Sequence, residues 1–297
     1  MNLKINNNVY DTSKKPLLMG ILNLSIDSPV ANSVISVDNA VQRARSLIND
    51  GADIIDIGAD STSSLSENIS IEKEVGIIKE VVKGISKLGA IVSIDTWKHE
   101  VAESAIMAGA SIDNDVTGFR DEKMIEILQK NQVIAVAMHM RGIPKKHYEV
   151  NQKYEYVDVE IFNYLKNKIN HLKNYDINEV WIDPGFGFGK STQDNISLLY
   201  SLNKLRQLKK PILISASRKG FLGDMLGIGT SQKSNQLLDA TLIFNLFSFL
   251  LGADILRVHD VKNMNNVMKT LYALVDFMDK NDESQNYYSR LINLLNR

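Results

Sequence analysis

The sequence predicts an α/β fold, a (β/α)8 TIM barrel, and two observations carry this prediction. Eight short apolar runs alternate with longer amphipathic stretches from Leu17 to Phe277. The runs are continuously apolar rather than alternating, which is typical of parallel strands buried on both faces. Eight such units fit one barrel within 297 residues, although the length alone would allow two domains. A doubly wound open sheet is the alternative, because the count of eight depends on Ser111–Asp115 being a strand.

Short runs rich in branched residues form the expected strands. In chain order these are Leu17–Asn23, Asp53–Gly58, Ala90–Asp95, Ser111–Asp115, Val133–Met138, Glu179–Asp183, Ile212–Ala216 and Asp254–His259. Apolar residues at helical spacing predict the helices between and after them. These are Val37–Asn49, Glu72–Leu88, Lys98–Ala108, Lys123–Lys130, Tyr154–Asn174, Ile196–Lys209, Asn235–Leu251 and Lys262–Phe277. Gly51, Gly109 and Gly252 each stand between a helix and a strand, where glycine adopts the left-handed conformation that ends a helix.

We expect a single domain over residues 1–279 and a short helical extension over residues 280–297. The extension begins with the polar string KNDESQNYY and continues as SRLINLLNR, whose apolar residues have helical spacing. It could pack on the outside of the barrel as a further helix, or it could form a dimer contact.

The composition excludes several classes of protein. The absence of cysteine rules out disulfides, a thiolate nucleophile and cysteine-ligated metal sites. With 34 Lys and Arg against 35 Asp and Glu, the chain has no positive field for nucleic acid. No run reaches the roughly 18 apolar residues that a membrane span needs, and the N-terminus lacks a signal-peptide core. We therefore expect a cytoplasmic protein that binds neither nucleic acid nor membrane.

Polar residues stand at or near the end of every expected strand, where barrel enzymes place their chemistry. In order they are Asn23, Asp56, Asp95, Asn114 with Asp115, His139, Asp183, Lys219, and Arg257 with His259. Any one of them could cap the following helix, but a complete set on one face needs partners or a ligand. The set therefore predicts a polar pocket that binds a ligand.

The residue types divide this pocket into two expected sides. The acceptors suit a ligand rich in N–H donors, such as a guanidine-like or pterin ring. These acceptors are Asp56, Asp95, Asn114 and Asp183. Lys219, Arg257 and His259, taken as cationic donors, suit a phosphate or diphosphate. Asn23 offers one amide oxygen to a hard cation such as Mg²⁺.

The glycine-rich string DPGFGFGKS resembles a phosphate-binding loop but does not match one. A Walker A loop needs glycine where Pro184 stands, so we interpret the glycines as a tight turn over the barrel mouth. Phe186 and Phe188 are then either buried or face a flat ligand. A nucleophilic triad is not expected, because Ser217 lacks the nucleophile elbow. His139 is expected to be structural, whereas His259 could be a base, an anion ligand or a core residue.

Taken together, several strings resemble the dihydropteroate synthase family, and the similarity extends from about Leu18 to Val261. The strings are MGILN (Met19–Asn23), GADIIDIG (Gly51–Gly58), SIDT (Ser93–Thr96), NDVTG (Asn114–Gly118), MHMRGIP (Met138–Pro144), DPGFGFGK (Asp183–Lys190), SRKGFLG (Ser217–Gly223) and RVHDV (Arg257–Val261). The resemblance implies a barrel enzyme of folate biosynthesis, commonly a homodimer. It joins a 6-hydroxymethyl-dihydropterin diphosphate to p-aminobenzoate, releases diphosphate and usually requires Mg²⁺.

The resemblance also implies a role for each matching residue. The pterin-binding set is Asp95, Asn114 and Asp183, with Lys219 beside the ring and Asp56 in support. The diphosphate-binding set is Arg257, His259, Thr62 and Asn23, the last with Mg²⁺. Phe188 borders the p-aminobenzoate site. The implied mechanism is dissociative: diphosphate leaves, Asp95 and Asp183 stabilise the methylene cation, and the neutral arylamine attacks without a strong base.

Two loops depart from the family pattern. The first loop, Asn23–Ser33, lacks the usual Pro and Phe but keeps Asp27 and Ser28. The second loop, Asp60–Leu65, has Ser63 where the family has an arginine. These departures leave the acceptor preference and the sulfonamide sensitivity open, whereas the pterin set is complete.

Two other functions compete with the synthase. One is a pterin-binding paralogue that has lost condensation. The other is a barrel methyltransferase that uses a methylated folate and needs no diphosphate site, so Lys219, Arg257 and His259 count against it.

Overall fold

Eight parallel strands form a closed barrel in the computed structural model, which describes residues 1–24, 37–62, 66, 69–228 and 235–280. The strands are β3 (Leu17–Asn23), β4 (Ile54–Gly58), β5 (Ile91–Asp95), β6 (Ile112–Asp115), β7 (Ile134–Met138), β8 (Val180–Asp183), β9 (Leu213–Ile214) and β10 (Ile255–Val258). Their order is β8-β7-β6-β5-β4-β3-β10-β9, and a parallel bridge between Ile182 and Ile212 closes the circle. The barrel prediction is confirmed, and the open-sheet alternative is wrong.

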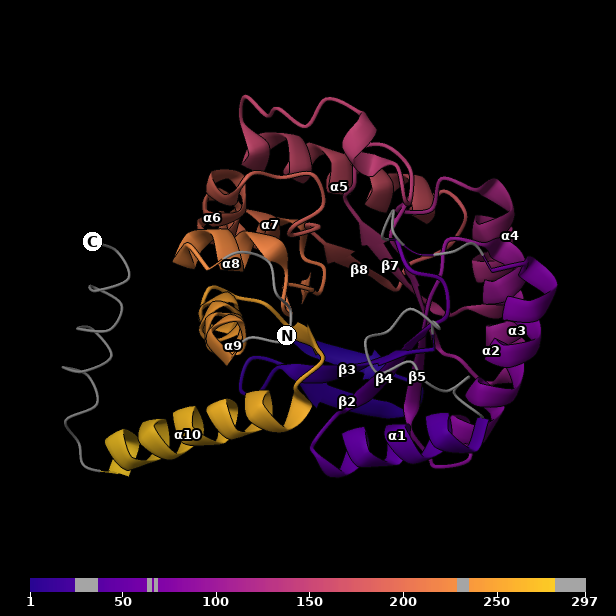
Figure 1. Ribbon diagram of the computed structural model, residues 1–297, viewed down its shortest axis with the longest axis horizontal. Coiled ribbons are helices and arrows are strands. Elements are labelled where there is room, and N and C mark those ends of the chain that lie inside the picture. The colour runs from indigo at the N-terminus through magenta and orange to yellow at the C-terminus, as the bar shows by residue number, and fades with distance from the viewer. Residues whose placement is uncertain (25–36, 63–65, 67–68, 229–234, 281–297) are drawn as a thin grey trace.

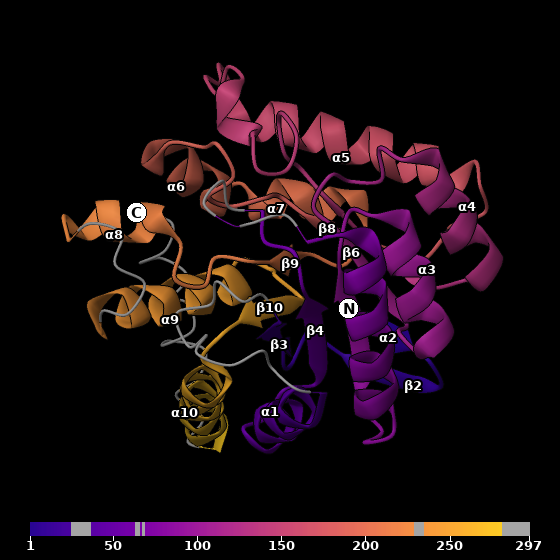
Figure 2. The same ribbon diagram turned by 45° about the vertical axis from the view of Figure 1, so that its right-hand side comes forward.

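Helices surround the barrel on the outside (Figures 1 and 2). They are α1 (Val37–Asn49), α2 (Ile71–Ser86), α3 (His99–Ala108), α4 (Glu122–Asn131), α5 (Val157–Lys173), α6 (Thr192–Tyr200), α7 (Leu202–Leu205), α8 (Gly220–Leu226), α9 (Asn235–Leu250) and α10 (Val261–Lys280). Gly51, Gly109 and Gly252 have φ values of 106°, 118° and 109°, as predicted for helix ends.

The structure corrects the predicted helices in two places. The helix expected at Ile196–Lys209 is divided into α6, α7 and a 3₁₀ turn at Arg206–Leu208. α6 begins earlier than expected because Ser191 and Asp194 form a capping box at its N-terminus. The short helix α8, which follows Lys219, was not expected at all.

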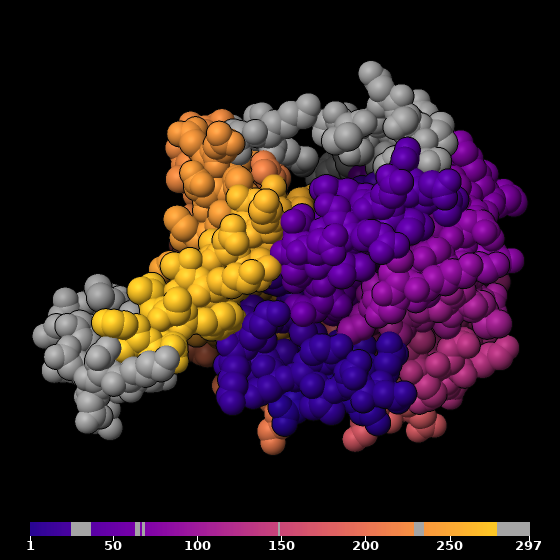
Figure 3. Space-filling view, turned by 90° about the horizontal axis from the view of Figure 1, so that it is seen from below, coloured from indigo at the N-terminus to yellow at the C-terminus, as the bar shows by residue number. Residues whose placement is uncertain are grey.

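A two-stranded hairpin at the N-terminus closes the amino-terminal end of the barrel. Strands β1 (Asn2–Ile5) and β2 (Asn8–Asp11) pair antiparallel, and Asn6 takes a left-handed φ of 54° in the turn. Leu3 and Ile5 are buried against the apolar residues that fill the barrel interior, including Trp181. In Figure 3 the hairpin is the indigo part of the surface. The sequence analysis missed this hairpin.

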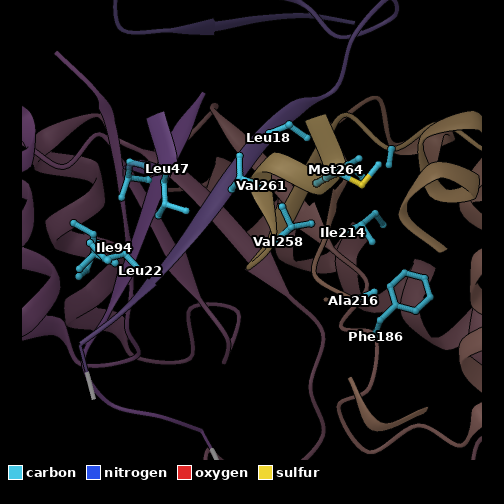
Figure 4. Packing of buried hydrophobic residues seen from close by; sticks show 14 of the residues in the cluster. Leu18, Leu22, Leu47, Ile94, Phe186, Ile214, Ala216, Val258, Val261 and Met264 are labelled. Atoms are coloured by element: carbon cyan, nitrogen blue, oxygen red, sulfur yellow. The ribbon is translucent and has the colours of Figure 1, made fainter. Parts of the chain in front are cut away.

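The larger apolar core lies between the barrel and the helices. Leu18 of β3 and Val258 of β10 pack there with Val261 and Met264 of α10 (Figure 4). A Cβ atom on Gly20 would lie 3.1 Å from Cγ2 of Val261, so glycine permits α10 to approach β3 closely. With its interior apolar at one end, the barrel leaves only the carboxyl ends of its strands for polar chemistry.

Helix α10 projects past the body of the barrel (Figures 1 and 3). Met264 and Met268 are fully buried, whereas Leu274 and Phe277 are mostly exposed. Residues 281–297, which hold nearly all of the predicted extension, lie outside the described residues, so the domain division stays a prediction. Within the described ranges, no helix combines the length and the apolar character needed to cross a membrane.

Candidate active site

A cavity of about 190 Å³ opens at the carboxyl ends of the strands. Its walls bring together nearly every residue that the sequence singled out. Those present are Asn23, Thr62, Asp95, Asn114, Asp183, Phe188, Lys219, Arg257 and His259. Asp56 lies just beneath the cavity and is completely buried. Because β4, β5, β6, β8 and β10 run parallel in one barrel, residues far apart in the sequence meet at this one end.

Arg257 links the carboxylates of the site. Its Nε donates to Asp56 at 2.5 Å, and its Nη2 donates to Asp95. Asn114 Nδ2 donates to the same Asp56 oxygen at 3.3 Å, and Arg257 Nη1 donates to Ser215 Oγ at 3.3 Å. The predicted separation of acceptors from cations is therefore wrong at Arg257, because a buried guanidinium needs carboxylate partners. Asp56 is the residue that holds this arginine in place.

Two carboxylates of the cavity wall, Asp95 and Asp183, have raised pKa values. Burial raises the pKa of Asp95 to about 7, against the opposing effect of Arg257. Burial also raises the pKa of Asp183, with Lys219 and the backbone N–H of Gly185 acting in the opposite direction. That N–H donates to Asp183 Oδ1 at 2.7 Å, which leaves Oδ2 for a ligand. Both groups are placed to accept hydrogen bonds from a ligand in the cavity.

Lys219 lies between the carboxylate wall and an aromatic ring. Its Nζ donates to the backbone carbonyl of Phe186 at 2.6 Å and stands 4.2 Å from the ring centroid of Phe188. Burial lowers the pKa of Lys219 to about 8, and nearby Asp183 opposes that shift. The side chain is therefore largely cationic at neutral pH.

His259 lies beside Arg257 at the cavity and is an exposed residue. Desolvation by the surrounding protein and the charge of Arg257 lower the pKa of His259 to about 4, and its role as a cation beside a bound anion stays a prediction. Ser217 Oγ accepts the backbone N–H of His259 at 3.2 Å and lies 3.0 Å from Nδ1. Because Ser217 Oγ already accepts one hydrogen bond, we assign its hydroxyl hydrogen to Nδ1 and the ring hydrogen to Nε2.

The glycine-rich segment forms a tight loop between β8 and α6, as predicted. Gly185, Gly187 and Gly189 have φ values of 73°, 76° and 61°. Phe186 is completely buried, whereas Phe188 lines the cavity, so the two aromatic residues have different environments. Of the two predicted alternatives, burial therefore applies to Phe186, and a position facing the ligand site applies to Phe188.

Lys190 and Asn195 support this loop, and the sequence analysis assigned a role to neither. Lys190 Nζ donates to the carbonyl of Gly185 at 2.7 Å, and burial lowers the pKa of Lys190 to about 7. Asn195 Oδ1 accepts the N–H of Gly187 at 2.8 Å. Their supporting role could have been inferred from the sequence, because both are polar residues next to a glycine loop whose backbone groups need hydrogen-bond partners.

His139 is structural, as expected. Its ring packs edge-on against Tyr164 at 4.9 Å, and its side chain is almost completely buried. Burial, reinforced by the charge of Lys190, lowers the pKa of His139 to about 2. A Cβ atom added to Gly185 would lie only 2.0 Å from the backbone carbonyl oxygen of His139, which is too close for any side chain.

Both atypical loops begin at the cavity wall, one at Asn23 and the other at Asp60. Asp27, Ser28 and Ser63 lie outside the described residues, as do positions 25–36 and 63–65. At the edges of those gaps, Asn23, Asp60, Ser61 and Thr62 line the cavity. In the described part of the chain, acidic and histidine side chains do not gather in threes to hold a metal ion.

Comparisons with known proteins agree with this geometry. A family described as pterin binding enzyme matches residues 19–259. Among curated relatives, a folate synthesis bifunctional protein of Arabidopsis thaliana is 36% identical over 94% of this chain, which spans 61% of that protein. Two further plant bifunctional proteins are matched over 56% and 52% of their length. The dihydropteroate synthase of Clostridium beijerinckii is 33% identical, over 92% of this chain and 99% of that protein.

Solved structures give the same result. The dihydropteroate synthase of Thermus thermophilus in complex with 4-aminobenzoate has a TM-score of 0.81 and is 33% identical, covering 92% of this chain and 100% of that one. The same enzyme in complex with 6HMPPP has a TM-score of 0.79 and is 32% identical, with the same coverage.

Proposed function

This chain belongs to the family of pterin-binding enzymes that contains the dihydropteroate synthases, and on that basis we propose that it catalyses their reaction. It would join 6-hydroxymethyl-dihydropterin diphosphate to p-aminobenzoate, giving dihydropteroate and diphosphate. The observation that carries the proposal is the meeting of Asp95, Asn114, Asp183, Lys219 and Arg257 at one cavity. The solved relatives that bind 4-aminobenzoate and 6HMPPP support the choice of substrates.

The carboxylate wall suits the pterin ring. A pterin presents N–H and NH₂ donors along one edge, and Asp95 and Asp183 present acceptors into the cavity. Asn114, oriented by its hydrogen bond to Asp56, adds an amide to the same wall. The aromatic ring of Phe188, with Lys219 over its face, offers a flat apolar border for p-aminobenzoate.

Donors in the same cavity lining suit the diphosphate. His259 presents an Nε2 hydrogen, Thr62 a hydroxyl and Arg257 a positive charge on the same cavity. Mg²⁺ fits beside them, because Asn23 offers a single exposed amide oxygen and Mg²⁺ takes its other ligands from phosphate oxygens and water. When bound, the ion would supply positive charge to the leaving diphosphate.

The reaction requires little proton transfer from the protein. The bond between the methylene carbon and the diphosphate oxygen breaks, and the electron pair leaves with the diphosphate. The amine nitrogen then forms a bond to that carbon and releases one proton to solvent. Asp95 and Asp183 stabilise the positive charge on the pterin, and His259 and Arg257 stabilise the negative charge on the leaving group.

We further propose that the protein is a cytoplasmic homodimer. Helices α8, α9 and α10 lie next to one another and carry exposed apolar side chains. These include Met225, Leu226, Ile243, Leu250 and Leu274. Surfaces of this kind mark protein interfaces. A molar mass measured by light scattering should be twice that of the chain, and a monomer would contradict the proposal.

Release of diphosphate by the purified protein tests the enzymatic proposal. We expect release with pterin diphosphate, Mg²⁺ and p-aminobenzoate together, and none when the pterin substrate is omitted. An Asp183→Asn variant should lose at least about 100-fold in kcat/KM, because it removes a charge needed in the transition state. A protein that binds pterin but releases no diphosphate with any arylamine would instead be the non-condensing paralogue. Rescue of a synthase-deficient strain would exclude that alternative.

A further inference from the structure

Four charged side chains form a buried cluster beside the cavity, and the cluster reaches the cavity wall through Asp60. Lys98 Nζ lies 2.8 Å from Asp60 Oδ2 and 2.6 Å from Glu74 Oε2. Lys145 Nζ lies 2.8 Å from the other oxygen of Asp60. The side chains of Asp60 and Glu74 are only 5% and 1% exposed, so both lysines neutralise carboxylates that water hardly reaches.

The cluster joins four separate parts of the barrel. Asp60 follows β4, Glu74 is on α2, Lys98 precedes α3, and Lys145 lies between β7 and α5. Burial raises the pKa of Glu74, and its contact with Lys98 acts in the opposite direction. Burying four charges is costly, and the reaction proposed above uses none of these groups.

The cluster holds the segment 60–62, whose residues line the cavity. Asp60 is fixed at one end of this segment by both lysines. At the other end, the backbone N–H of Lys145 donates to the carbonyl of Thr62 at 3.1 Å. Lys145 therefore contacts the segment through its side chain and its backbone. The pterin-binding acceptors Asn114 and Asp183 lie on strands β6 and β8 themselves, where Asn114 is bonded to Asp56 and Asp183 to the backbone N–H of Gly185.

We propose that Lys98 and Lys145 are positioning residues that hold segment 60–62 against the cavity and thereby set the affinity for the diphosphate part of the substrate. This inference rests on the proposed function, since it assigns Thr62 to the diphosphate. Because the pterin ring is held by other residues, loss of the cluster should weaken binding of a pterin diphosphate and spare binding of the corresponding pterin alcohol.

Calorimetric binding of these two ligands to the full-length protein, with Mg²⁺ present, tests the inference. For Lys98→Met we expect the Kd of the pterin diphosphate to rise about tenfold or more, because even a small displacement of the binding groups weakens their contacts with the ligand. The Kd of the pterin alcohol should change less than about twofold. Lys98→Arg should restore diphosphate affinity, because it keeps the charge between Asp60 and Glu74. Lys146→Met, a change of an exposed neighbouring lysine, is the matched control.

Equal losses for both ligands, or no loss for either, would overturn the positioning role. Since Lys98→Met leaves Glu74 unpaired, a Lys98→Met/Glu74→Gln double variant removes one charge of each sign and should show the same selective loss if the single variant unfolds. If the unaltered protein binds the diphosphate no better than the alcohol, the proposed function fails and not the role of the cluster.

Discussion

Asp95 and Lys219 line one cavity with opposite charges and with pKa values that burial draws toward neutrality. The pKa of Asp95 is raised to about 7 and that of Lys219 is lowered to about 8. A pterin needs an ionised acceptor at Asp95, and the substrate anion favours a charged Lys219. We therefore expect kcat/KM for the pterin diphosphate, which reports the free enzyme, to rise as pH increases through about 7 and to fall above about 8.

Two variants separate the limbs of this profile. Asp95→Asn should lose the acid limb, and it also distinguishes Asp95 from Lys190, whose pKa is likewise about 7. Lys219→Arg should lose the alkaline limb, because a guanidinium stays charged. Both variants will be slower, so the shape of each profile is the measurement. An acid limb that persists in Asp95→Asn would contradict the assignment.

The residue types in the sequence predicted which side chains line the cavity but not the pKa value of each one. Asp95, Asn114, Asp183 and Lys219 were identified from their positions after apolar runs, and the structure places all four on the cavity. The lowered pKa of His259 could not be predicted, because it depends on desolvation by the surrounding protein and on Arg257 beside it. Both are consequences of tertiary packing.

At the scale of elements, the loop between β8 and α6 depends on Gly185. Its φ of 73° disfavours any side chain, and a Cβ atom would meet the carbonyl oxygen of His139 at 2.0 Å. Gly185→Ala should displace the loop that holds Lys219 and Phe188. We expect kcat/KM to fall by about tenfold or more, because a displacement of ~1 Å can cost up to 100-fold.

A glycine in a helix provides the control for this loop. A Cβ atom on Gly76 of α2 would meet nothing within 4 Å. Gly76→Ala should therefore keep full activity and raise the free energy of unfolding by about 0.5–1 kcal/mol. Thermal unfolding and steady-state kinetics on both variants check the contrast, and wild-type kinetics for Gly185→Ala would contradict the role of the loop.

Strand β6 carries a buried carboxyl, Asp113, that faces away from the cavity. Neither of its oxygens has a hydrogen-bond partner among the described residues. Burial, with Asp115 and Asp95 nearby, raises the pKa of Asp113 well above its usual value. The folded protein then keeps a proton that the unfolded chain releases, so Asp113 makes stability fall as pH rises from its unfolded pKa toward the folded one.

We expect Asp113→Val to stabilise the protein at pH 8 by about 1–3 kcal/mol, since it removes an unsatisfied buried group. Asp113→Asn keeps the shape and removes the ionisation, so it should reduce the pH dependence of the melting temperature. Denaturation at pH 5 and pH 8 measures both effects. A valine variant less stable than the parent at pH 8 would show that the carboxyl has a partner.

For the whole molecule, a change in the N-terminal hairpin should lower stability without changing catalysis. Ile5 is completely buried at the end of the barrel opposite the cavity. Ile5→Ala should cost about 2–5 kcal/mol of unfolding free energy because it leaves a hole in the barrel interior. The kcat and KM values measured well below the melting temperature should not change, because the active end of a barrel is built from other loops.

An exposed residue of the same hairpin is the control for Ile5. Val9 is 67% exposed, so Val9→Ala should change the unfolding free energy by less than about 0.5 kcal/mol. Urea denaturation distinguishes the two variants. A change in KM for either substrate in Ile5→Ala would mean that the two ends of the barrel are coupled.

The amino-acid sequence was enough to predict the barrel, the order of its strands and most of the residues at its mouth. That information is local: apolar runs, helix-ending glycines and polar residues after strands are each visible within a few positions. The folded structure was needed to show that Arg257 binds Asp56 and Asp95, that the pKa of His259 is lowered, and that two lysines contact Asp60. Those features depend on distances between residues up to 201 positions apart and on burial, which the folded barrel alone creates.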